Sequence, residues 1–138
     1  LVSGGIVLII DSCQLRSDFF HAALLILAHS RKGRIEISQL DVARKYNFTI
    51  LAIRFNGSKD ARISSYKLVG KTESAVKEVK TGIKDAASFA AANFEEYIAK
   101  FENVEPDSEG KVIVEVKGLD TGSAAEGHIN ALCISLAK

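Results

Sequence analysis

Cysteine is scarce in this chain, and the two cysteines that occur stand far apart. Cys13 and Cys133 form no CxxC motif and no Cys/His spacing. Zinc sites need clustered ligands and disulfide frameworks need several paired cysteines, so neither is indicated. We expect two reduced thiols, no metal, no cofactor and a cytoplasmic location.

An excess of charge of either sign is also missing. The chain has 18 Lys and Arg against 17 Asp and Glu, which gives a formal net charge of +1. Binding to nucleic acid or to an anionic membrane draws on a surplus of basic residues, so we expect no nucleic acid and no membrane as a partner. No apolar run reaches the roughly 18 residues of a membrane-spanning helix. Residues 1–10 lack the basic leading region of a signal peptide.

The glycine-rich phosphate loops of nucleotide-binding enzymes are absent as well. No GxGxxG or GxxxxGK pattern occurs, and Gly4 and Gly5 precede an apolar stretch rather than follow one. His21 and His29 have no cysteine or carboxylate at metal-ligand spacing. We expect structural roles for them and for His128. The sequence favours a protein that is not an enzyme.

Methionine is absent altogether, and the first residue is Leu1. An initiator methionine is not normally removed before leucine, which indicates a fragment or a processed product. The 138 residues match the commonest domain size and suffice to bury a core. We expect a single domain over residues 1–138.

The most apolar part of the sequence lies at 5–33. Residues 6–10 are a continuous run of Ile, Val and Leu, the pattern of a strand buried on both faces. Residues 19–28 contain one polar side chain, His21, and predict a buried helix with Ser17 as its N-cap. A strand that leads directly into a helix is typical of layered α/β domains.

The rest of the sequence continues this alternation of strands and helices. Strands are predicted at 48–55, 61–69 and 111–118, with a hairpin turn at Asn56 and Gly57, and 34–40 is predicted as a strand or an extended connection. Helical spacing predicts a long helix over 72–101 with a break at Thr81 and Gly82, and a last helix from Ser123 that buries Ile129, Leu132, Cys133 and Leu136. We therefore expect a single-domain α/β fold: a layered, mainly parallel sheet with one antiparallel hairpin and helices packed on it. The alternative is an α+β fold with a mixed sheet.

Polar residues follow the first and the last predicted strands. Asp11 and Ser12 come after the first strand, and Asp120 and Thr121 come after the last. The carboxyl ends of parallel strands meet at one edge of a sheet, where open α/β folds bind ligands. These four residues are therefore the candidate ligand-binding site, although Asp and Ser after a strand are also ordinary turn and capping residues.

The order and spacing of these elements resemble a von Willebrand factor A-like domain over residues 6–123. The resemblance rests on an apolar strand that ends in Asp, a helix, a strand that ends in Phe, a short antiparallel strand and the stretch KVIVEVKGLDTG. It implies a module for metal-dependent adhesion or scaffold assembly. The first metal motif of that family is Asp-x-Ser-x-Ser, and Cys13 and Leu15 stand at its two serine positions, so no metal site is implied here.

No catalytic motif emerges, whereas the predicted helices carry more apolar surface than a small sheet covers. We therefore expect a non-enzymatic protein–protein interaction or assembly module, a scaffold that binds a protein partner or forms a homo-oligomer. Phe89, Phe94 and Tyr97 of the predicted helix at 72–101 are the interface candidates. The alternative is a small ligand- or metal-binding enzyme domain that uses Asp11 and Asp120.

Overall fold

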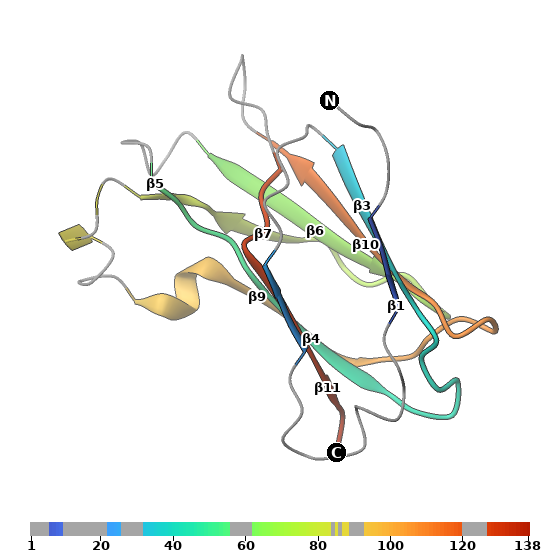
Figure 1. The fold of residues 1–138 in the computed structure, drawn as a ribbon. Coiled ribbons are helices and arrows are strands. Elements are labelled where there is room, and N and C mark those ends of the chain that lie inside the picture. The colour runs from blue at the N-terminus through green and yellow to red at the C-terminus, as the bar shows by residue number, and fades with distance from the viewer. Residues whose placement is uncertain are drawn as a thin grey trace.

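The computed structural model describes residues 6–9, 22–25, 32–55, 62–83, 85, 87–88, 93–119 and 127–138. Within these residues the regular elements are strands β1 to β11, one short 3-10 helix, η2 (Phe94–Tyr97), and a helical pair at 87–88. Two sheets pack face to face, so the fold is a β-sandwich (Figure 1). The prediction of an α/β domain is therefore wrong, and the α+β alternative fails with it because both need helices packed on a sheet.

The first layer is a five-stranded sheet. Its order is β1 (Ile6–Ile9), β3 (Lys32–Ser38), β10 (Val112–Gly118), β6 (Ile63–Val69) and β7 (Lys77–Lys80). β1 pairs with β3 in parallel, and the other pairs of this sheet are antiparallel. The prediction of a mainly parallel sheet is thus corrected to a mainly antiparallel one.

The second layer is a four-stranded antiparallel sheet. Its order is β2 (Ala22–Leu25), β11 (Ala131–Leu136), β4 (Tyr46–Leu51) and β9 (Ile98–Val104). A two-stranded parallel pair, β5 (Arg54–Phe55) with β8 (Gly82–Ile83), stands beside it. The predicted hairpin between 48–55 and 61–69 does not form, because β4 and β6 belong to different sheets.

One hydrophobic core lies between the two sheets, and among the described side chains it is supplied by residues of β3, β4, β6, β7, β9, β10 and β11. The five-stranded sheet contributes Ile35, Ile37, Tyr66, Leu68, Val79, Val112, Val114 and Val116, and the four-stranded sheet contributes Tyr46, Phe48, Ile50, Ala99, Phe101, Leu132 and Ile134. Within most of these strands they stand two residues apart. This period of two explains why these residues form strands, since β-branched and aromatic side chains pack well on a pleated surface that is buried on one face. A satellite cluster of Ile53, Ile83 and Tyr97 lies against Leu51.

Strands occupy most of the regular structure that is described within the predicted helices, and η2 is a short 3-10 helix within one of them. β2 occupies the middle of the predicted helix at 19–28, β7, β8, η2 and the start of β9 occupy 72–101, and β11 lies within the last predicted helix. In β11 the residues with period two, Leu132 and Ile134, are buried, whereas Cys133 is turned to the other face. Short apolar runs fit both the helical period and the strand period. In this protein, pairing with neighbouring strands favours the strand. Strands β1, β3, β6 and β10 confirm the predictions over 6–9, 34–38, 63–69 and 112–118, and 48–55 is divided between β4 and β5.

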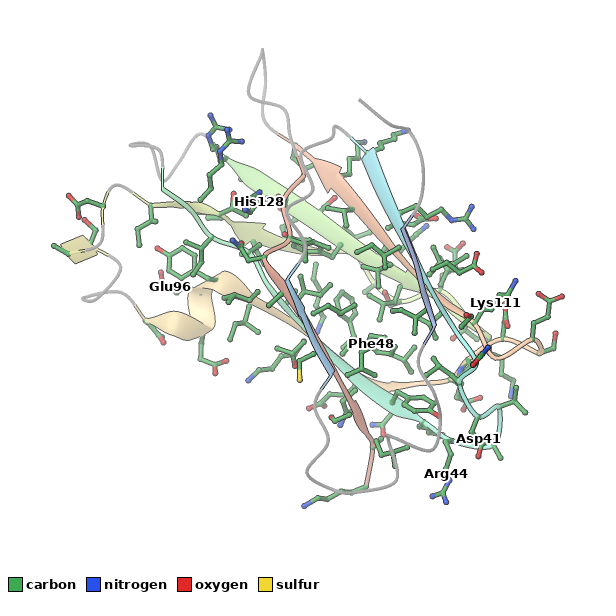
Figure 2. The ribbon with its side chains drawn as sticks, viewed as in Figure 1. Asp41, Arg44, Phe48, Glu96, Lys111 and His128 are labelled. Atoms are coloured by element: carbon green, nitrogen blue, oxygen red, sulfur yellow. The ribbon has the colours of Figure 1, made fainter. Side chains whose placement is uncertain are left out.

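Strand directions give the sandwich two distinct ends. We call one the Asp41 end; the connections at 39–45, 70–76 and 105–111 lie there. We call the other the His128 end; β4, β7 and β10 leave their sheets there. Figure 2 shows Phe48 between the sheets, with Asp41 and His128 toward opposite ends.

Candidate binding surfaces

The four residues predicted to bind a ligand, Asp11, Ser12, Asp120 and Thr121, lie outside the described residues. Their grouping depended on parallel strands. β10 is antiparallel to β3 and β3 is parallel to β1, so the chain leaves β1 at Ile9 and β10 at Gly118 toward opposite ends of the sheet. The prediction that Asp11 and Asp120 follow strands that end at the same edge of the sheet is therefore wrong. The resemblance to a von Willebrand factor A-like domain required a parallel sheet, so it is wrong as well.

The three residues predicted to form an interface are Phe89, Phe94 and Tyr97. Phe89 lies outside the described residues, and Phe94 lies in η2. Tyr97 is 1% exposed and packs in the satellite cluster with Ile53 and Ile83. Its carbonyl oxygen also accepts a hydrogen bond from the backbone N–H of Ala52 at 3.0 Å. Tyr97 thus joins the satellite cluster to β4 in the single chain.

Buried polar groups gather at the His128 end, and they tie the chain to itself. The backbone N–H of His128 donates to the Ser64 hydroxyl at 3.0 Å, and the Tyr66 hydroxyl donates to the His128 carbonyl. Nearby, the side-chain oxygen of Asn130 accepts a hydrogen bond from the backbone N–H of Ile53 at 2.6 Å. Buried polar atoms need such partners, so these residues hold the strand connections in place. Sequence reasoning missed Ser64 and Tyr66, because nothing in a strand pattern marks which hydroxyl has a backbone partner.

The Asp41 end is fixed by short hydrogen-bonded turns. The Glu105 carboxylate lies 3.0 Å from the Lys71 ammonium and 3.4 Å from that of Lys45. Hydrogen bonds from Lys71 and then Lys45 lower the pKa of the Glu105 carboxyl. Asp107 accepts hydrogen bonds from the backbone N–H groups of Glu109 and Lys111, each at 2.9 Å. These acidic residues are thus engaged in shaping the turns.

Two further observations concern the described residues only. Among them, no group of three His, Cys, Asp or Glu side chains lies close enough to hold a metal ion. No helix in the same part of the chain is long and apolar enough to cross a membrane.

The outer face of the five-stranded sheet is rich in charge. Strand alternation places these charged residues on it: Lys32, Arg34, Glu36, Lys67, Glu78, Lys80, Glu115 and Lys117. Lys67 lies 3.3 Å from Glu73 and 3.5 Å from Glu115, and Lys111 lies 3.4 Å from Glu36. Lys67 and Lys111 both have a raised pKa, because their ammonium groups donate hydrogen bonds to Glu73 and Glu36 respectively, and these bonds stabilise the charged forms. A face of this kind is well solvated.

The outer face of the four-stranded sheet is different. Its two inner strands, β4 and β11, place only uncharged residues there, which we call the uncharged face: Asn47, Thr49, Leu51, Ala131, Cys133 and Ser135. They are paired across the two strands, Thr49 with Cys133 and Leu51 with Ala131, and all are partly exposed. The flanking strand β9 adds Ile98 and the charged residues Lys100 and Glu102 at its border, and the Lys100 ammonium lies 2.8 Å from the Glu95 carboxylate. Protein interfaces are depleted of charged residues at their centre, and this face shares that one feature.

Comparison with known proteins adds little to this description. The sequence matches no protein family and no curated protein. Among solved structures, an insecticidal delta-endotoxin from Bacillus thuringiensis is 8% identical with a TM-score of 0.43, over 86% of this chain and 20% of that protein. A beta-glucosidase from Paenibacillus barengoltzii is 12% identical with a TM-score of 0.43, over 95% of this chain and 11% of that enzyme. This chain thus spans only a small part of either protein, and similarity at this level assigns neither family nor function.

Proposed function

We propose that this chain is a non-enzymatic protein–protein interaction module, and that it self-associates through the uncharged face. The observation that supports this function is the contrast between the two outer faces of the sandwich. Many charged side chains lie on one of them, whereas β4 and β11 place Thr49, Leu51, Ala131 and Cys133 on the other. Charged residues are depleted from the centres of protein interfaces, because burying a charge without a partner is unfavourable.

A second copy is the partner that fits best. The uncharged face needs a surface that is itself free of charge, and the charged face of a neighbouring chain does not supply one. The matching surface on another copy is therefore the same face, which gives a two-fold dimer in which each chain contributes β4 and β11.

Sedimentation equilibrium tests this function. We expect the wild-type mass to rise toward that of a dimer as the concentration increases through the micromolar range. Thr49→Lys adds a charge at the centre of the uncharged face and is expected to leave a monomer. Ile113→Lys is the matched control, since Ile113 is also a partly exposed β-branched residue of a central strand, but lies on the charged face. A wild-type monomer at all concentrations would refute the proposal, as would a Thr49→Lys variant that still dimerises.

The proposal includes a reducing, cytoplasmic compartment. What supports it is the scarcity of cysteine, since Cys13 and Cys133 form no CxxC motif and no disulfide framework. Cys133 carries a thiol on the uncharged face and is partly exposed. Burial raises the pKa of this thiol, so it stays protonated and unreactive at neutral pH. No observation on the described residues favours the alternative of an enzyme that uses Asp11 and Asp120.

A further inference from the structure

We draw no further inference here: the strongest candidate, the side-chain cluster in which Lys77 of β7 contacts the Phe101 ring and the Lys100 carbonyl of β9, joins the edges of the two sheets within one chain, and nothing among the described residues shows what else would cover those edges.

Discussion

The hydroxyl group of Tyr66 donates a hydrogen bond to the backbone carbonyl of His128, which joins the middle of the five-stranded sheet to the segment that leads into β11. Tyr66 is fully buried, and His128 is 4% exposed. In Tyr66→Phe the carbonyl loses this partner away from water. We expect a loss of roughly 1–3 kcal/mol in the free energy of unfolding by urea. A loss below that of the exposed substitution Val42→Ala would show that the contact does not stabilise the fold.

The same tyrosine makes stability depend on pH in the alkaline range. Burial raises the pKa of the Tyr66 hydroxyl above its ordinary value, and a hydrogen bond with Ser64 opposes this shift. Because the folded pKa is the higher one, the stabilisation is fully present below the unfolded pKa of about 10 and is lost as the pH rises above it. We expect the free energy of unfolding to fall less steeply between about pH 9.5 and 11 in Tyr66→Phe than in the wild type. Parallel curves would contradict this assignment.

Gly110 occupies a position that no side chain fits. Its φ is +75°, and a Cβ atom there would lie 2.5 Å from the carbonyl oxygen of Leu40. The N–H of Leu40 donates to the Gly110 carbonyl at 3.0 Å, so the two backbones are held together. We expect both Gly110→Ala and Gly110→Asn to destabilise the fold by roughly 1–3 kcal/mol in urea denaturation. Asn tolerates a positive φ, so an Asn variant of wild-type stability would mean that close approach is not the constraint.

Phe48 tests the core between the two sheets. It is 0% exposed and lies on β4 within the main hydrophobic cluster. Phe48→Ala should reduce the free energy of unfolding by about 3–5 kcal/mol. Val42→Ala, at a residue that is 59% exposed, should stay within about 0.5 kcal/mol of the wild type. Similar losses in the two variants would contradict the placement of the core.

The sequence predicts the positions of several strands correctly, but it does not predict which strands pair with one another. At 111–118 the alternation of Val112, Val114 and Val116 indicates a strand with one buried face, and β10 has that face in the core. At 131–136 the apolar residues fit both a helix and a strand. The helical interpretation buried Cys133, whereas the strand buries Ile134. The pairing of β11 with β2 and β4 decides between the helical and the strand period, and this pairing cannot be read from the local sequence.

The uncharged face could not be predicted from the sequence either, because it depends on which strands pair. The uncharged face is formed by alternate residues of β4 and β11, whose sequences are about 80 residues apart. Thr49 lies next to Cys133 only because β4 pairs with β11 in this register. The interface candidates from the sequence relied on a helix at 72–101 and so pointed to a different part of the chain. Recognising the face required the strand order and not only the strands.

Intermolecular nuclear Overhauser effects test most directly whether copies meet through the uncharged face. In an equimolar mixture of ¹³C-labelled and unlabelled chains at a concentration where dimers form, filtered spectra report only contacts between chains. We expect such contacts at the methyl groups of Thr49, Leu51 and Ala131, and none at Ile113 on the charged face. Contacts at Ile113 with silent methyl groups at Thr49 and Ala131 would contradict the account, as would a mass that stays monomeric at every concentration measured.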